Sequence, residues 1–257
     1  MLEDTIKALQ DERDLLARDL RERTAQLEAL TGELQQFTYA VSHDLRAPLR
    51  AMEGFARILL EDYPAKLDAD GKRALEVILA SARKSALLIE DLTTLSRVCG
   101  KPFAPACVKM EELAQEKIAK LREDAPTAVF AVGHLPETWG DKDLLAVVWE
   151  QLIRNSVKFS RQKNRPAITI TGRTEGRQTV YQVRDNGVGF DPTRASRLFG
   201  LFQKLHEETE FEGRGVGLAM VRRLVHRHGG ETWAEGKVNK GATFFFSLPL
   251  RESAAVR

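Results

Sequence analysis

Cysteine is scarce in this chain, which has only Cys99 and Cys107 among its 257 residues. Two cysteines cannot build the disulfide framework of a small secreted domain, and a single pair supplies too few ligands for a structural metal centre. This scarcity therefore excludes the disulfide-rich class and favours a reduced, cytoplasmic protein.

Long apolar runs are also missing. No stretch approaches the ~20 apolar residues that a membrane span needs, and no signal peptide precedes the first helix. The 39 basic and 37 acidic residues leave a formal net charge of only +2, and the basic clusters at 161–165 and 222–228 are typical of solvated faces. We therefore predict neither a membrane span nor a nucleic-acid partner.

A heptad repeat runs through residues 2–41. Ten of its twelve a and d positions are apolar; the twelve are Leu2, Ile6, Leu9, Arg13, Leu16, Leu20, Arg23, Leu27, Leu30, Leu34, Phe37 and Val41. A repeat sustained over five heptads without proline predicts a parallel coiled coil, and so a homodimer. The alternative is one long helix packed on a domain. We expect the coil to continue from an upstream segment that this chain lacks.

Two broader apolar stripes follow, at 49–59 and 75–92, and Pro64 and Gly71 bracket the turn between them. This pattern predicts an αα-hairpin. A single hairpin cannot cover both of its apolar faces, so two hairpins are expected to form a dimeric four-helix bundle.

Pro48 stands inside the first hairpin helix, in the stretch SHDLRAPL. A proline there removes the hydrogen bond to the Asp44 carbonyl and costs a helix roughly 3 kcal/mol. The costly position lies about one turn after His43, which we expect to be exposed. Strain beside reactive side chains is typical of a functional site.

Beyond residue 108 the pattern changes to mixed α and β. We predict helices at 110–123, 141–159 and 216–228, and strands at 127–132, 167–174, 178–184, 230–235 and 242–248. These elements indicate an α/β sandwich with its helices on one side of a mixed sheet. The predicted domains are a coiled-coil linker at 1–36, a helical hairpin at 37–98, a linker at 99–108, the sandwich at 109–250 and a tail at 251–257.

Four short stretches of this second half combine polar side chains with glycine. They are the helix flank with Gln151, Asn155 and Lys158, the strand end RDNGVGF at 184–190, the loop and helix start FEGRGVGLAM at 211–220, and the turn NKGATFFF at 239–246. Glycine lets the backbone approach a ligand, and a helix N-terminus favours phosphate. Each stretch alone also fits a solvated face or an ordinary turn.

In this order and at these separations, the four stretches resemble the ATP-binding domain of histidine kinases, a Bergerat-type (HATPase_c) fold of the superfamily that includes gyrase and the heat-shock chaperone ATPases. QLIRNSVKF is similar to the N box, DNGVGF to the G1 box, LFGLFQKLH to the F box and GRGVGLAM to the G2 box. SHDLRAPL resembles the H box of the HisKA dimerisation and phosphotransfer domain. The resemblance covers about residues 34–250 and is strongest to bacteriophytochrome output modules.

The resemblance implies a role for each matching residue. His43 would be the nucleophile toward the γ-phosphate of ATP, with Asp44 holding its second ring nitrogen. Asn155 would bind Mg²⁺ through the nucleotide, and Asp185 would accept from the adenine amine. The other implied ATP-binding residues are Lys158, Gly187, Gly189, Lys204, Gly213, Gly215, Gly217 and Thr243.

Three positions depart from the family pattern. Gln151 stands where the N box usually has asparagine, and Lys204 stands where the F box often has arginine. Ala47 stands one turn after His43, where kinases with phosphatase activity often have threonine or asparagine. Alanine cannot orient a water molecule, which argues against that route to phosphatase activity.

The resemblance predicts a cytoplasmic, homodimeric sensor kinase fragment without its sensor domain. It would use ATP and Mg²⁺ to phosphorylate His43 and would pass the phosphoryl group to an aspartate of a response regulator receiver domain. One alternative is the same module acting mainly as phosphatase of its regulator. The others are a conformational ATPase, which would need a glutamate at Gln151, and a non-catalytic dimerising scaffold.

Overall fold

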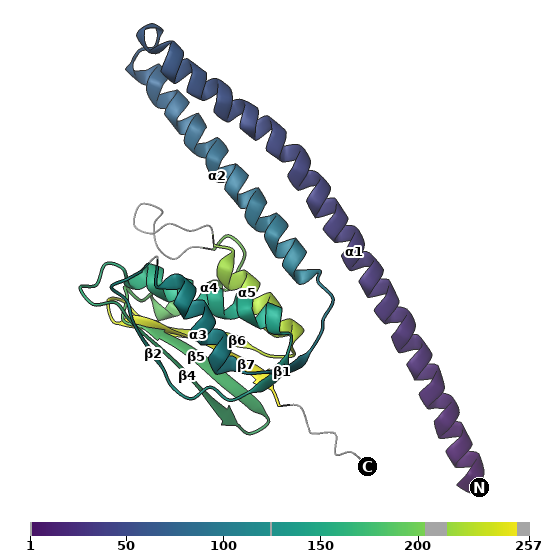
Figure 1. The fold of residues 1–257 in the computed structure, drawn as a ribbon. Helices are drawn as coiled ribbons and strands as arrows, with labels where there is room; N and C mark the ends of the chain where they lie inside the picture. The colour runs from purple at the N-terminus through teal and green to yellow at the C-terminus, as the bar shows by residue number, and fades with distance from the viewer. Residues whose placement is uncertain (1, 124, 204–214, 251–257) are drawn as a thin grey trace. The chain divides into compact units, whose positions relative to one another are not determined.

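The computed structural model describes residues 2–123, 125–203 and 215–250. It divides into two units, a helical unit at Met1–Lys101 and a mixed unit at Pro102–Arg257 (Figure 1). No helix in the described part of the chain is both long enough and apolar enough to cross a membrane. The predicted tail at 251–257 lies outside the described residues.

The first unit begins with α1, Leu2–Asp62, a single helix of 61 residues. The predicted coiled coil and the first hairpin helix are thus one element. Helical structure continues through Pro48 without interruption. The hydrogen bonds of the turns on both sides offset the one bond that this proline removes.

The heptad positions of α1 lie on its exposed surface within one chain. The described apolar members of this seam are Ile6, Leu9, Leu16, Leu20, Leu30, Leu34, Phe37 and Val41; the side chains of Leu2 and Leu27 lie outside the description. Arg13 and Arg23 carry their own countercharges, since they pair with Asp14 at 2.7 Å and with Asp19 at 2.9 Å. These pairs reduce the repulsion that two seam arginines would otherwise bring to a coil.

The hairpin turns at the short 3₁₀ helix η1, Pro64–Lys66, and returns as α2, Ala69–Cys99. Asp68 caps α2 by accepting from the Gly71 N–H at 2.7 Å. Ala56 of α1 and Ala82 of α2 are both buried, and Arg83 of α2 pairs with Glu53 of α1 at 3.0 Å. The predicted hairpin is confirmed.

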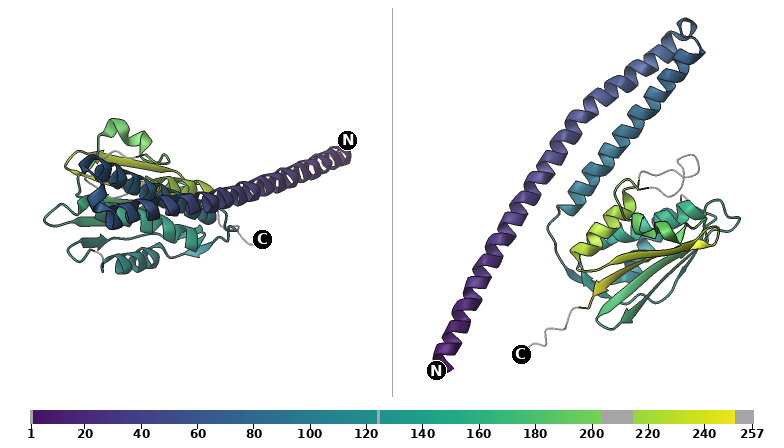
Figure 2. Two further views of the ribbon diagram at one scale, coloured as in Figure 1. Left: turned by 90° about the horizontal axis from the view of Figure 1, so that it is seen from above. Right: turned by 180° about the vertical axis from the view of Figure 1, so that it is seen from behind.

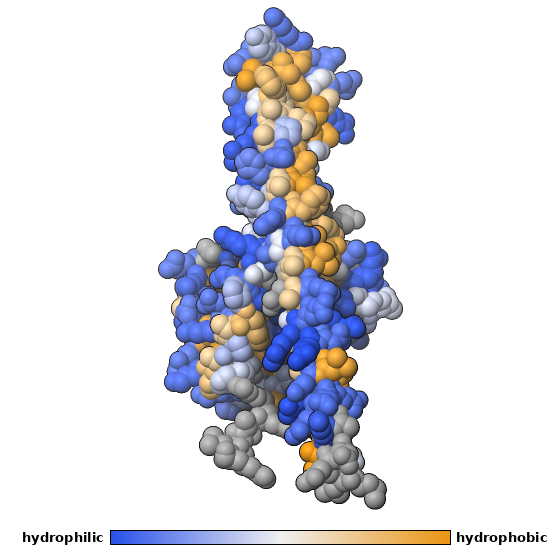
Figure 3. All heavy atoms as spheres, turned by 90° about the vertical axis from the view of Figure 1, so that its right-hand side faces the viewer, coloured by the Kyte–Doolittle hydropathy of each residue, from blue (hydrophilic) through white to orange (hydrophobic). Residues whose placement is uncertain are grey.

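One face of the described hairpin carries exposed apolar side chains. Figure 3 shows apolar side chains gathered in a band along the helical unit; its exposed members include Met52, Phe55, Ile58, Val77, Ile78 and Leu87. A band of this length on a monomer is typical of an interaction face. The four-helix bundle stays a prediction.

The second unit is built on a five-stranded sheet with the order β2-β4-β5-β7-β6. Its strands are β2 Val129–Val132, β4 Ala167–Glu175, β5 Gln178–Asp185, β6 Thr232–Lys237 and β7 Gly241–Pro249. β2 and β4 are parallel, and the other neighbours are antiparallel. The predicted strands are confirmed within a few residues at each end.

A separate two-stranded sheet, β1 Ala106–Val108 with β3 Thr138–Gly140, was not predicted. The end of the predicted linker at 99–108 is therefore wrong, because its last three residues are a strand. Three-residue strands have too few positions to show an alternating pattern, so the sequence carried no signal for them.

The helices α3 (Met110–Leu121), α4 (Lys142–Ser160) and α5 (Gly217–Arg227) cover one face of the five-stranded sheet (Figure 2). Trp149 of α4 lies fully buried against Tyr181 of β5 and Phe246 of β7, with ring centroids 5.8 and 5.1 Å apart. This aromatic core fixes α4 on the sheet. The predicted α/β sandwich is confirmed.

Candidate active site

His43 stands on the surface of α1, with 69% of its side chain exposed. Its Nδ1 lies 3.2 Å from Oδ1 of Asp44. When Nδ1 carries the ring proton it donates to this carboxylate, and Nε2 keeps an available lone pair. The pair can therefore present a nucleophilic nitrogen.

Asp185 ends β5 and is buried, with 3% of the residue exposed. Its Oδ1 accepts from the N–H of Gly187 at 2.9 Å and from the N–H of Ala242 at 3.2 Å. Burial raises the pKa of this carboxyl, while these two bonds and the neighbouring Ser156 hydroxyl lower it. The Ser156 hydroxyl makes no well-formed hydrogen bond to it within the described residues.

The second carboxylate oxygen of Asp185, Oδ2, determines which ligand group this site can bind. Oδ2 is buried and has no hydrogen-bond partner among the described residues. A buried acceptor without a donor costs about 1–3 kcal/mol. A ligand that brings an N–H to this oxygen removes that cost, and the exocyclic amine of adenine is such a donor.

The glycines of the DNGVGF stretch allow close packing of the protein's own backbone. A Cβ on Gly187 would lie 2.4 Å from the Phe159 carbonyl oxygen. Gly189 has φ +61°, and a Cβ there would lie 2.0 Å from the Lys237 carbonyl oxygen. They hold the loop after Asp185 against α4 and β6, so they shape the site from behind.

The polar flank of α4 carries Gln151, Asn155 and Lys158, all partly exposed. The Asn155 carboxamide has no hydrogen-bond partner within the described ranges, and the Lys158 ammonium lies 4.0 Å from the Phe159 ring centroid. Gln151 reaches the start of α5, since a Cβ on Gly217 would lie 2.6 Å from its Oε1. The flank therefore adjoins the glycine-rich helix start.

The α5 N-terminus begins at Gly217, with Val216 as N-cap. Gly215 just before it has φ +73°, which favours glycine, and its carbonyl accepts from the Phe202 N–H at 2.9 Å. Lys204 and Gly213, also predicted for this site, lie outside the described residues. The helix start offers backbone N–H groups without side-chain caps, which suits an anion.

Two family models match the chain. Residues 33–98 match the His Kinase A (phospho-acceptor) domain, and residues 140–252 match the histidine kinase-, DNA gyrase B- and HSP90-like ATPase domain. The chain belongs to the sensor histidine kinases. The family predicted from the H, N, G1, F and G2 boxes is therefore confirmed.

Named relatives agree with this histidine kinase module. It is 31% identical to the phytochrome-like protein Cph1 of Synechocystis over 91% of the chain and 31% of that protein, and 36% identical to the methanogenesis regulatory histidine kinase FilI of Methanothrix harundinacea over 90% and 26%. The module thus spans about a third or less of these relatives. The phytochrome-like protein Cph1 among these relatives agrees with the predicted resemblance to bacteriophytochrome output modules.

Solved structures share the fold of the module. Full-length ShkA, crystallised in complex with AMPPNP, aligns with a TM-score of 0.59 and 26% identity over 86% of the module and 47% of ShkA. The histidine kinase AdeS of Acinetobacter baumannii aligns with a TM-score of 0.56 and 18% identity over 82% of the module and 98% of its own chain. The hairpin followed by a mixed α/β domain is thus a histidine kinase fold.

One predicted ATP-binding residue of the module does not fit its geometry. Thr243 pairs across strands with Arg184 of β5 and Glu235 of β6. Asp185 is the residue after Arg184 in β5. Because successive strand residues face opposite sides of a sheet, the Thr243 side chain lies on the face away from Asp185. The Ala242 N–H reaches the carboxylate instead, so the Thr243 prediction is wrong.

Sequence reasoning missed two polar residues that shape the kinase site. Asn186 accepts from the Ala167 N–H at 3.0 Å and donates to the Arg165 carbonyl at 2.9 Å, which ties the start of β4 to the end of β5. Ser156 is fully buried beside Asp185. A serine within the apolar stripe of α4 was the available signal for the second.

Proposed function

We propose that this histidine kinase module binds ATP in the second unit, transfers its γ-phosphoryl group to His43 and then passes it to an aspartate of a receiver domain. The observation that carries the proposal is Oδ2 of Asp185, which is buried and has no hydrogen-bond partner in the described part of the chain. The AMPPNP complex of the related kinase ShkA supports an adenine nucleotide as ligand.

The nucleotide would be held by groups of three elements. Asp185 of β5 would accept from the adenine amine. The start of α5, with Gly215 and Gly217, would donate backbone N–H groups to phosphate oxygens. Lys158 of α4 would neutralise phosphate charge, and Lys204 and Gly213 remain part of this proposal.

Mg²⁺ fits this site through the nucleotide. No cluster of three or more His, Cys, Asp or Glu side chains in the described residues could hold a metal ion. Asn155 offers a carboxamide oxygen, and a Mg²⁺ ion in proteins is often held by few protein oxygens, phosphates and water. When bound, the ion would neutralise charge on the β- and γ-phosphates.

His43 and Asp44 of α1 would together carry out the phosphoryl transfer step. The Nε2 lone pair of His43 forms a bond to the γ-phosphorus, the bond between that phosphorus and the bridging oxygen breaks, and ADP leaves with the electron pair. Positive charge on the imidazole is stabilised by the Asp44 carboxylate at Nδ1. A receiver carboxylate then takes the phosphoryl group and returns neutral imidazole.

Incubation with γ-labelled ATP, with and without the receiver domain encoded nearest to this protein, tests the sequence of steps. Label on histidine followed by label on the receiver supports the proposal. Absence of label from the chain after prolonged incubation contradicts it. Release of inorganic phosphate without any labelled protein favours a conformational ATPase.

A homodimer is part of the proposal, because the α1 seam and the hairpin band are both exposed in one chain. The proposed domains keep the predicted bounds 1–36 and 37–98, and the ATP-binding domain begins with β1 at residue 106 and ends at 250. The coil would serve as the input element for an upstream sensor.

We predict that the register of α1 sets the output. Seven residues inserted beside Thr24 restore both the a/d seam and the facing of His43, whereas three or four rotate the downstream helix relative to the seam. In a protein that carries its sensor, the seven-residue insertion should keep the signal response and the shorter ones should alter it. Equal receiver phosphorylation across all insertions of one to seven residues would reduce the coil to a tether.

We also predict weak phosphatase activity. Ala47 is exposed one turn after His43 and offers no polar atom to hold a water molecule. Ala47→Asn and Ala47→Thr should increase dephosphorylation of the phosphorylated receiver, because their polar atoms can position a water molecule for attack. Ala47→Ser adds a shorter hydroxyl as a comparison. Vigorous dephosphorylation by the parent would make phosphatase the main activity instead.

A further inference from the structure

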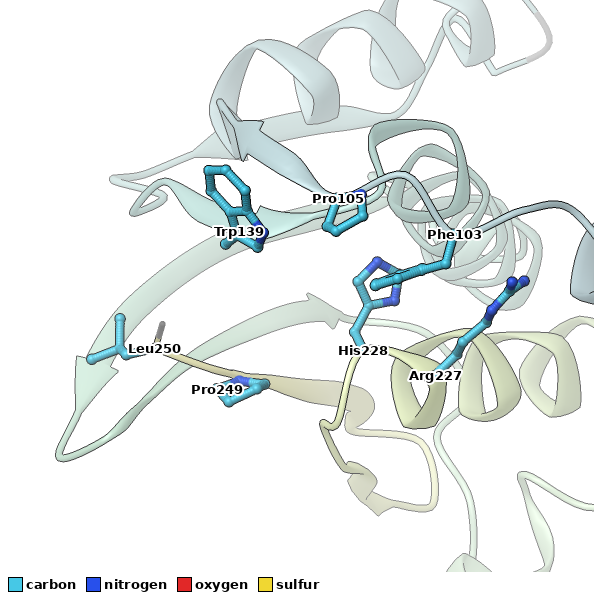
Figure 4. Close-up of a pocket in the computed structure, with 7 residues that line it drawn as sticks. All are labelled: Phe103, Pro105, Trp139, Arg227, His228, Pro249 and Leu250. Carbon is cyan, nitrogen blue, oxygen red and sulfur yellow. The ribbon is translucent and has the colours of Figure 1, made fainter. Parts of the chain in front are cut away.

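The segment that enters the second unit, Phe103–Pro105, is docked by three contacts. The Ala104 N–H donates to Oδ2 of Asp141 at 3.0 Å. The Phe103 ring meets His228 edge to face with centroids 4.9 Å apart, and the Arg227 guanidinium lies 5.6 Å from the same ring (Figure 4). We call Phe103, Ala104, Asp141, Arg227 and His228 the linker clasp.

Within the clasp, Asp141 and His228 are also joined to each other. The Asp141 N–H donates to Nε2 of His228 at 3.0 Å, and Nδ1 of His228 donates to the Leu224 carbonyl at 2.7 Å. Only the neutral ring with its proton on Nδ1 makes both bonds. Burial lowers the pKa of His228 and favours this neutral form.

These two residues terminate the helices that lead to the nucleotide site. Asp141 caps α4 by accepting at Oδ1 from the N–H groups of Asp143 and Leu144, at 3.0 and 3.1 Å. His228 caps the C-terminus of α5. The opposite end of α5 is the glycine-rich start, and the α4 flank carries Asn155.

We propose that Asp141 and His228 are positioning residues through which docking of Phe103–Pro105 sets α4 and α5 for nucleotide binding. The proposal rests on the function proposed above. A shift of the segment moves the Asp141 carboxylate, and with it the first turn of α4 and the C-terminal end of α5. The two helices are thereby held together at the end away from the glycine-rich helix start.

The Phe103 side of the clasp is only partly enclosed. Phe103 is 39% exposed, and an open cavity of about 290 Å³ lies beside it, lined also by Trp139, Pro249 and Leu250 (Figure 4). The ring is seated on His228 without being enclosed. If docking improves nucleotide binding, then nucleotide binding must improve docking by the same factor.

Reciprocity gives two measurements on the full chain. A non-hydrolysable ATP analogue should slow hydrogen exchange at the Ala104 amide, whose N–H the clasp protects. Phe103→Ala removes a side chain that lies at the end of α5 and outside the proposed nucleotide site. It should weaken binding of that analogue about fivefold, the lower end of the range for coupled sites. Leu250→Ala removes an apolar side chain from the same cavity without touching His228, and should bind as the parent does.

Variants of His228 separate positioning from general packing. His228→Gln keeps a donor and an acceptor and should retain most of the coupling between analogue binding and Ala104 exchange. His228→Phe keeps a ring without either group and should lose it, even where its fold is intact by circular dichroism. Equal coupling in the two variants would overturn the assigned hydrogen-bonding role.

The outcomes distinguish this proposal from the one it rests on. Unchanged exchange at Ala104, or unchanged affinity in Phe103→Ala, overturns the clasp while the analogue still binds the parent. An analogue that fails to bind the parent overturns the proposed function itself. Asp185→Asn serves as the reference in which the added analogue should leave Ala104 exchange unaltered.

Discussion

The Asp185→Asn variant is expected to lose ATP affinity by about 100-fold or more, a cost on the order of 3 kcal/mol. The carboxylate oxygen Oδ2 is buried and has no partner among the described residues, so in the proposed complex the adenine amine supplies its donor. An amide that keeps its oxygen toward the Gly187 and Ala242 N–H groups must turn its NH₂ toward that amine. Two donors then face each other with no acceptor between them.

The same variant should be more stable than the parent without nucleotide. Because burial raises the pKa of Asp185 in the folded state, the unfolded chain ionises first as pH rises. The charged carboxylate therefore lowers the free energy of unfolding above the ordinary aspartate pKa of about 3.9, and the neutral amide does not. The stability advantage of the variant should be absent at low pH and grow as pH rises.

Calorimetric titration with ATP and thermal unfolding at several pH values check these two effects together. Asp68→Asn is the matched control, because it makes the same change at the exposed cap of α2, where asparagine caps equally well. It should leave both ATP affinity and stability unchanged. Undiminished ATP affinity in Asp185→Asn would remove Asp185 from the site.

His43→Gln is expected to abolish acid-labile phosphorylation while ATP still binds normally. Glutamine keeps polarity at this exposed position but has no nucleophilic ring nitrogen. Asp44→Asn should retain the acceptor and slow labelling about 100-fold, within the range for a lost acid–base partner. The measurement is the γ-label that the protein retains after alkaline treatment and loses after acid treatment.

His226→Gln provides the control for this experiment, since His226 is an exposed histidine of α5 in the other unit. Its labelling should equal that of the parent. Persistent acid-labile label on the His43→Gln variant would show that another residue accepts the phosphoryl group.

Regular elements and the family were predictable from this sequence because their signals are periodic or compositional. The heptad of α1, the apolar stripe of α4 and the alternation in β5 each repeat over many residues, so single exceptions such as Pro48 do not obscure them. The order of the boxes then identified the family. The same boxes placed Asp185 and Asn155 on elements that adjoin.

Features that depend on one contact between distant residues could not be predicted. The bond between Asp141 and His228 joins positions 87 residues apart, and no local pattern marks it. His228 looked like a solvated residue near a helix end, yet it is buried. The Thr243 prediction was wrong for a related reason. The sheet face on which Thr243 lies is set by its pairing with Arg184 and not by its own neighbours in sequence.

The place of β7 between β5 and β6 has a consequence for biosynthesis. Asp185 receives the Ala242 N–H from a residue 57 positions later in the chain. At roughly 5–20 residues per second, a ribosome needs about 3–11 s to add that stretch after Asp185 has been made. The helical hairpin consists of sequence-local contacts and emerges before the second unit. A nascent chain can thus fold the hairpin that carries His43 while the surroundings of Asp185 are still incomplete, so the proposed ATP site is the last part of the module to form.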